Sequence, residues 1–227
     1  MKTYTHTTLR KITAAFVAIL GLTLFLSSCE RDDPEMEGTA SIRVIHSAQA
    51  TGSVDLFADD VKLNNSAIAY SQSSTYFETK AGERTIQTRL AGSTQVVSTQ
   101  SVNLEPGKQY TIYVTGTGGA GAGTVVTTDD NSSPSSSQGK VRFINLSTLT
   151  STASLVLDNS TTLFTNVAYG STSDLAAVAP GSHTFKVTSA ANANVSATTT
   201  VNIQAGKIYT VYLTGTTVLG INAVANN

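Results

Sequence analysis

The sequence has one cysteine, no tryptophan and three histidines among its 227 residues, and charged residues make up only 13% of it. A single cysteine excludes an intramolecular disulfide, and the lack of a His or Cys cluster excludes the usual zinc ligand sets. The first 28 residues hold three of the 14 basic residues and no acidic one, so removing them leaves 11 basic and 15 acidic residues, a net charge of −4. Nucleic acid is not expected as a partner, because neutralising phosphates requires clustered lysine and arginine.

Long hydrophobic runs are scarce too, and the longest apolar stretch lies at the N-terminus. Residues 12–26 read ITAAFVAILGLTLFL and follow a basic start that carries Lys2, Arg10 and Lys11. As a helix this stretch would span about 22 Å, which is short of a hydrocarbon core of about 30 Å. A basic start followed by a short apolar run is typical of a secretory signal rather than a permanent membrane span.

The end of this stretch, Leu26-Ser27-Ser28-Cys29, resembles the lipobox of bacterial lipoproteins. The resemblance implies that residues 1–28 are a signal peptide and that Cys29 receives a diacylglyceryl group and becomes the N-terminus. Two or three acyl chains would anchor the protein firmly, since each buried methylene contributes about 0.8 kcal/mol. The alternative is an ordinary signal peptide followed by a chance cysteine.

The residues after the cysteine form an acidic cluster, Glu30, Arg31, Asp32 and Asp33. One interpretation is a solvated tether over residues 29–38. The cluster also resembles the surface-export signal of Bacteroidota lipoproteins, and position +2 is not the aspartate linked to inner-membrane retention. The resemblance implies an outer-membrane, lipid-anchored protein that is exposed at the cell surface.

The rest of the chain is a tandem repeat. Residues 104–117 read LEPGKQYTIYVTGT, and 99 positions later residues 203–216 read IQAGKIYTVYLTGT. The same offset aligns SIRVI at residue 41 with KVRFI at residue 140. We therefore predict two domains, 39–130 and 140–227, joined by a Ser-rich linker at 131–139. A flexible coil of this length spans roughly 17 Å, so the linker is expected to let the domains reorient.

Each copy shows strand-like alternation. Ile86, Thr88 and Leu90 would share one face of a strand while Gln87 and Arg89 point away. About seven to nine short strands per copy, separated by frequent turn residues, predict an all-β fold of two immunoglobulin-like β-sandwich domains.

The repeated stretch is interpreted as a folding device. Gly107 and Gly206 can take the positive φ that a turn requires, and Tyr110 and Tyr209 then point inward. This arrangement looks like the corner of immunoglobulin-like and fibronectin-like domains, where a tyrosine near the start of a strand bonds back to the preceding turn.

The opening of the first copy, RVIHSAQATGSVDLFADD, together with Tyr70, Lys80-Ala81-Gly82 and GKQYTIYVTGT, resembles the family known as domain of unknown function 4397. The resemblance covers residues 41–130 well and 140–227 more weakly. It implies a secreted or lipid-anchored protein, an immunoglobulin-like β-sandwich, and no established activity.

Catalytic candidates are few. His46, near Ser47 and Asp55, is the best candidate for a Ser-His-Asp site. The second copy has Asn145 and Ser154 in place of the histidine and the aspartate, so a side chain capping a strand edge is the favoured interpretation. His183 is expected to be a solvated residue in a turn. We predict that the protein is not an enzyme.

Calcium is the one metal that the sequence leaves open. Oxygen ligands could come from Asp59-Asp60 and Asp129-Asp130-Asn131, and in the second copy from Asp158-Asn159 and Asn226-Asn227. Asp and Asn are also ordinary turn residues, and we favour turns. No cofactor is predicted apart from the covalent lipid on Cys29.

Tyr113 and Tyr212 would lie on the outward face of their strands, each between two threonines, and this face is the candidate ligand surface. Cross-strand packing is the alternative. The sequence therefore predicts a non-enzymatic outer-membrane lipoprotein that acts in surface binding, adhesion or envelope scaffolding, with an extracellular protein or glycan as partner. The alternative function is an accessory glycan-binding lipoprotein of an outer-membrane uptake system, and a hydrolase is a third class.

Overall fold

The structure is a computed structural model that describes residues 36–116, 122–130, 137–189 and 196–226. The predicted signal peptide, Cys29 and the cluster Glu30, Arg31, Asp32 and Asp33 lie outside the described residues. Met36–Asn227 forms one compact unit. Within the described residues, every regular secondary-structure element is a β-strand. None of these residues forms a helix that is long and apolar enough to cross a membrane.

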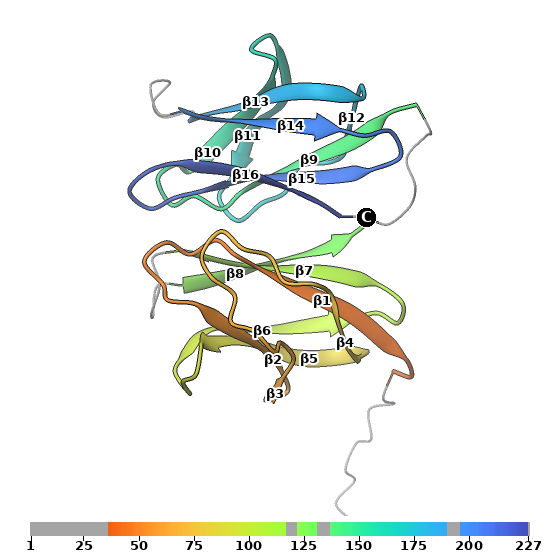
Figure 1. The fold of residues 1–227 in the computed structure, drawn as a ribbon, viewed down its shortest axis with the longest axis vertical. Helices are drawn as coiled ribbons and strands as arrows, with labels where there is room; N and C mark the ends of the chain where they lie inside the picture. The colour runs from red at the N-terminus through yellow and green to blue at the C-terminus, as the bar shows by residue number, and fades with distance from the viewer. Residues whose placement is uncertain (1–35, 117–121, 131–136, 190–195, 227) are drawn as a thin grey trace, which may run out of the picture. The chain divides into compact units, whose positions relative to one another are not determined.

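The first copy is a β-sandwich of two four-stranded sheets, β4-β1-β7-β8 and β3-β2-β5-β6 (Figure 1). The strands β1 and β7 are parallel and the other pairs are antiparallel. The strands are β1 (Thr39–His46), β2 (Val54–Ala58), β3 (Val61–Lys62), β4 (Phe77–Lys80), β5 (Gly82–Leu90), β6 (Val96–Leu104), β7 (Gln109–Gly116) and β8 (Ala122–Asp129).

The second copy repeats this topology with the sheets β12-β9-β15-β16 and β11-β10-β13-β14. Its strands are β9 (Gly139–Asn145), β10 (Thr152–Leu157), β11 (Thr161–Ala168), β12 (Ala176–Val178), β13 (Gly181–Ser189), β14 (Ser196–Ile203), β15 (Ile208–Thr214) and β16 (Gly220–Ala225). The prediction of an all-β fold of two sandwich domains is confirmed.

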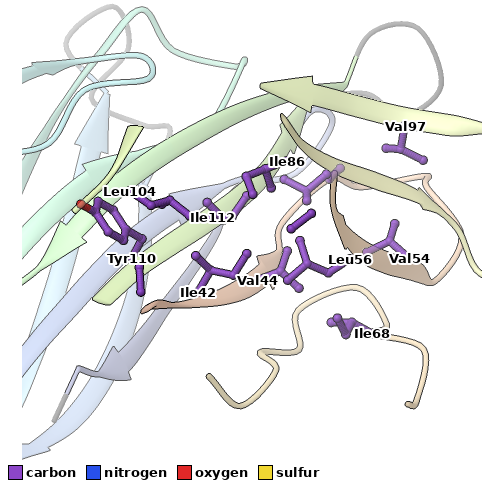
Figure 2. Packing of buried hydrophobic residues seen from close by; sticks show 14 residues of the cluster. Ile42, Val44, Val54, Leu56, Ile68, Ile86, Val97, Leu104, Tyr110 and Ile112 are labelled. Carbon is purple, nitrogen blue, oxygen red and sulfur yellow. The ribbon is translucent and has the colours of Figure 1, made fainter. Parts of the chain in front are cut away.

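Alternation places one face of each strand in a sandwich core. In the first copy Ile42 and Val44 of β1 pack with Leu56 of β2, Ile86 of β5 and Ile112 of β7 (Figure 2). Each of these five side chains is at most 2% exposed. Burying an aliphatic side chain of this size contributes about 1.5–3 kcal/mol, so this core is a main source of the sandwich's stability. A second cluster built around Phe143, Leu155 and Phe185 fills the other sandwich.

The repeated stretch makes the same corner twice. Gly107 and Gly206 have φ of +74° and +76°, a region in which glycine is favoured. The backbone N–H of Glu105 donates to the hydroxyl of Tyr110 at 2.9 Å, and that of Gln204 donates to Tyr209 at 3.1 Å. Each tyrosine thus buries its ring in a core and uses its hydroxyl to fix the turn before its own strand.

The outward faces of β1–β7 and β9–β15 pack against each other. A third apolar cluster there contains Ile45 and Tyr113 from the first copy and Ile144, Leu146 and Tyr212 from the second. The expectation that the linker lets the two sandwiches reorient is therefore wrong, because a buried apolar face joins them.

Candidate functional site

The best catalytic candidate of the sequence does not assemble. His46 is fully buried, and its Nε2 lies 3.0 Å from the carbonyl oxygen of Gly52. Burial lowers the pKa of His46, so the ring is favoured in its neutral form. The hydroxyl of Ser47 donates to the carbonyl oxygen of Val114 at 2.6 Å. His46 and Ser47 are thus each committed to a backbone carbonyl.

Asp55 belongs to a different network. Its carboxylate lies 2.8 Å from Nζ of Lys62 and accepts a hydrogen bond from Nδ2 of Asn64 at 2.9 Å. Burial raises the pKa of Asp55, but the hydrogen bonds from Lys62 and Asn64 outweigh it and hold the pKa below its usual range. The three sequence neighbours His46, Ser47 and Asp55 therefore have three separate structural roles.

The prediction that His183 lies in the turn before the strand is wrong, because it lies within β13, where its side chain is 16% exposed. Its Nδ1 is 2.7 Å from a carboxylate oxygen of Asp158, and its Nε2 is 2.9 Å from the carbonyl oxygen of Ala179. The hydrogen bond from His183 lowers the pKa of Asp158. In the first copy Arg84 takes the same position, 3.3 Å from the turn residue Asp59.

The acidic loops considered for calcium are tight turns held by side-chain bonds. Asp59 and Asp60 have positive φ of +46° and +65°, and Asp158 and Asn159 have +50° and +58°. Asp59 accepts from the backbone N–H of Thr85 at 2.8 Å, and Asp60 pairs with Arg89. Within the described residues, no group of three or more His, Cys, Asp or Glu side chains is placed to hold a metal ion.

Asp129 and Asn226, which the sequence also suggested as calcium ligands, lie between the sandwiches. Asp129, whose side chain is fully buried, accepts hydrogen bonds from Tyr76 at 2.6 Å and from Arg142 at 2.5 Å, and Arg43 is 3.8 Å away. The oxygen of Asn226 accepts from Nη2 of Arg43 at 3.0 Å. Burial raises the pKa of Tyr76, and the Asp129 carboxylate adds to the effect.

These contacts repeat with near two-fold symmetry. Arg43 of the first copy reaches the end of the second, where it donates to the carbonyl oxygen of Ala225 at 3.1 Å. Its counterpart Arg142 reaches back to the carbonyl oxygen of Thr128 at 3.0 Å. The duplicated arginines thus bind each other's domain, as equivalent residues do in a symmetric dimer.

The prediction of an exposed ligand face at Tyr113 and Tyr212 is wrong. Tyr113 is 0% exposed and Tyr212 is 4% exposed, and their ring centroids lie 5.8 Å apart at a tilt of 59°. Burial raises the pKa of both hydroxyls, that of Tyr212 to about 12. The outward tyrosine of each copy is covered by the outward tyrosine of the other, so neither ring can stack on a ligand.

A groove that the sequence did not point to opens at an edge of the first sandwich, with a volume of about 340 Å³. We call it the edge groove; its first wall is residues 64–68, and its second wall is residues 72–75 with Phe77. The first wall is bonded to β2: Oδ1 of Asn64 accepts from the N–H of Leu56 at 2.7 Å, and Ile68 exchanges backbone hydrogen bonds with Val54. Figure 2 shows Ile68 on a coil segment beside the β2 residues of the core.

The second wall is bonded to β1 of the opposite sheet. The backbone N–H of His46 donates to the carbonyl oxygen of Gln72 at 3.0 Å, and the backbone N–H of Ser74 donates to the carbonyl oxygen of Val44 at 2.9 Å. The hydroxyl of Ser74 also accepts from the N–H of Val44 at 3.0 Å. The edge groove therefore lies between the two sheets of the sandwich, and each wall is fixed to a core strand.

The lining of the edge groove is polar and uncharged. It includes the exposed amides of Asn65 and Gln72, the exposed hydroxyls of Ser66 and Thr75, and the less exposed apolar residues Ile68 and Phe77. Amides and hydroxyls can donate and accept hydrogen bonds. A second hollow of about 410 Å³ lies further along the same edge, where Val61 and Leu63 meet charged side chains that include Glu78 and Arg84.

The second copy does not share the residues of the first wall. At the repeat offset, Asn64 and Asn65 correspond to Leu163 and Phe164, which pack against the second core. They belong to β11, which runs through Thr161–Ala168, whereas β3 of the first copy ends at Lys62. This divergence between the copies was the sequence feature that could have located the edge groove.

Comparisons with known proteins agree with the duplication. The family described as domain of unknown function DUF4397 matches residues 40–153 and 150–226. No curated protein matches the chain.

Among solved structures, the Bacillus anthracis TIE protein is 11% identical with a TM-score of 0.26 over 78% of this chain, which spans 34% of that protein. A family CBM26 module, CBMbc of Eubacterium rectale Amy13K in complex with maltoheptaose, is 8% identical with a TM-score of 0.23, over 81% of this chain and 96% of that one.

Proposed function

The chain belongs to the DUF4397 family, and on that premise we propose that it is a non-enzymatic, lipid-anchored binding protein of the outer membrane. Its two sandwiches form one body, and the edge groove of the first sandwich is its ligand site. The lipid on Cys29 holds this body at the membrane, and the acidic residues that follow direct it to the cell surface.

The observation that carries the binding role is the edge groove. Its first wall rests on a buried polar pair, Asp55 and Asn64, each 3% exposed. Buried polar pairs contribute little net stability compared with apolar packing. The second copy folds with Ser154 and Leu163 at these positions. A feature that the fold does not need, and that shapes a surface hollow, is best explained by a ligand.

The non-enzymatic role is supported by the contacts of the candidate catalytic side chains, which are already bound within the protein. The ring of His46 is buried against the carbonyl oxygen of Gly52, and the carboxylate of Asp55 is bound to Lys62 and Asn64. A general base must reach a substrate proton, and neither group is placed to do so.

Anchoring and exposure are tested on intact cells. Metabolic labelling with a radioactive fatty acid is expected to mark the wild-type protein and not a Cys29→Ser variant. External protease is expected to digest the two sandwiches without disruption of the outer membrane. An unlabelled wild-type protein would contradict the anchor, and digestion only after the outer membrane is opened would contradict surface exposure.

The alternative function, an accessory glycan-binding lipoprotein beside an outer-membrane uptake system, is favoured by one observation. The lining of the edge groove is neutral and rich in amides and hydroxyls. Deletion of the gene would then impair growth on one polysaccharide and leave growth on its monosaccharide unchanged. Equal growth on both would contradict an uptake role.

A further inference from the structure

We infer that the edge groove binds a neutral saccharide, with Asn65 and Gln72 as the side chains that read its hydroxyl groups. The inference rests on the proposed binding function and names the ligand class of that same site. Three properties of the groove support it. The walls are fixed, the lining is polar and uncharged, and the backbone groups of Ile68 and Gln72 are already hydrogen-bonded within the protein.

The walls are preformed. Nδ2 of Asn64 donates to the carbonyl oxygen of Ser66 at 2.8 Å as well as to Asp55, so the loop that carries Asn65 is fixed from within. The opposite wall is bonded to β1 through Gln72 and Ser74. A groove that needs little ordering on binding loses less affinity to conformational entropy. Its volume, about 340 Å³, is at the lower end of small-molecule sites.

The chemistry of the lining selects the ligand class. Its residues carry no charge, so the affinity cannot come from ion pairing with a phosphate, sulfate or carboxylate. A ligand that pairs with amides and hydroxyls must itself donate and accept hydrogen bonds. The partly exposed ring of Phe77 beside these groups suits the C–H face of a sugar ring. A polyhydroxylated, uncharged molecule meets all three conditions.

A peptide strand suits this groove less well. Strand addition requires backbone N–H and C=O groups that are still open along an edge. Here Ile68 exchanges both of its backbone hydrogen bonds with Val54, and the carbonyl oxygen of Gln72 accepts from His46. The side chains of the walls therefore offer the recognition, which is how a saccharide is read.

The test uses the detergent-purified full chain and an array of immobilised oligosaccharides. The array holds neutral gluco-, manno-, xylo- and galacto-oligosaccharides, their sulfated counterparts, and unfolded casein as a polypeptide probe. Affinities are measured for the wild type, Asn65→Ala and Gln72→Ala. The controls are Gln100→Ala, at an exposed glutamine on β6, and Tyr169→Ala, at an exposed tyrosine of the second copy. Circular dichroism and thermal unfolding establish that each variant is folded.

We expect at least one neutral saccharide to bind, and Asn65→Ala and Gln72→Ala each to weaken that binding about tenfold. The two controls should stay within about twofold. Three results would overturn the inference: no neutral saccharide binds, folded groove variants bind as the wild type does, or binding to sulfated sugars or casein is the groove-dependent activity. If the inference fails while Cys29 is acylated and the sandwiches are surface-exposed, the proposed anchoring and location still stand.

Discussion

Replacing Asp129 with alanine should destabilise the whole molecule. The carboxylate is fully buried and lies 2.5 Å from Arg142 and 3.8 Å from Arg43, and the hydroxyls of Tyr76 and Thr111 donate to it. The variant leaves two arginines buried between the sandwiches without their carboxylate. Removing one partner of a buried ion pair costs about 3–5 kcal/mol, a large part of the roughly 5–15 kcal/mol that stabilises a folded domain.

Urea unfolding followed by circular dichroism measures this loss. With a slope of about 2 kcal/mol per M, the midpoint should fall by roughly 2 M. Asp59→Asn is the control, because the side chain of Asp59 is 46% exposed in its pair with Arg84, and such pairs contribute about 1 kcal/mol or less. Asparagine also tolerates the positive φ of this position and keeps an oxygen for the N–H of Thr85. If Asp129→Ala shifts the midpoint no more than Asp59→Asn does, this carboxylate does not neutralise the buried arginines and the reasoning about the interface is refuted.

Three further variants test other parts of the account. Asn226→Asp supplies Arg43 with a carboxylate and removes an amide nitrogen that has no partner among the described residues. The variant should therefore raise the free energy of unfolding by about 1 kcal/mol in the same urea assay. A lower urea midpoint would contradict this. Gly206→Val places a branched residue at φ +76° at a cost of about 1–2 kcal/mol. Because a buried apolar cluster joins the two sandwiches, both should unfold in one shifted transition, and an unchanged first sandwich would show that they are independent. His46→Asn, which introduces the residue of the second copy, should remove a pH dependence of the free energy of unfolding. Burial lowers the pKa of His46 in the folded state, so the unfolded state binds the extra proton. The wild type therefore loses stability as the pH falls below about 6.5. Urea midpoints measured down to about pH 5 that decline equally in both proteins would contradict that assignment.

The period of the strands and the duplication were sufficient to predict the two sandwiches. Alternating residues such as Ile86 and Thr88 fixed which face entered the core, and the glycine–tyrosine spacing predicted the corners at Tyr110 and Tyr209. These features depend on local geometry, which the order of the residues largely determines.

The outward faces could not be assigned in the same way. Alternation predicts that one face of a strand avoids the core, but it does not say what covers that face. Here Tyr113 is covered by Tyr212, and Ile45 packs in the same cluster as Ile144. The retention of apolar residues and of an arginine on the outward face of both copies is the signal that indicates a shared interface.

The edge groove was missed for a related reason. The differences between the copies at His46 and Asp55 bore on catalysis alone, whereas the groove lies where Asn64 and Asn65 of the first copy correspond to Leu163 and Phe164 of the second. Asn64 is bonded to Asp55 and to the backbone of Leu56, and those contacts form only when a loop and β2 come together in space. A propensity or a spacing along the chain does not contain that information.

The most direct test of the central claim, that the first copy alone carries the ligand site, is an NMR titration of the full chain in detergent micelles with the neutral oligosaccharides of the array. The account predicts that the side-chain amide signals of Asn65 and Gln72 shift on titration and that the backbone signals of Leu163 and Phe164 do not. Shifts confined to Leu163 and Phe164, or equal shifts in both copies, would contradict it.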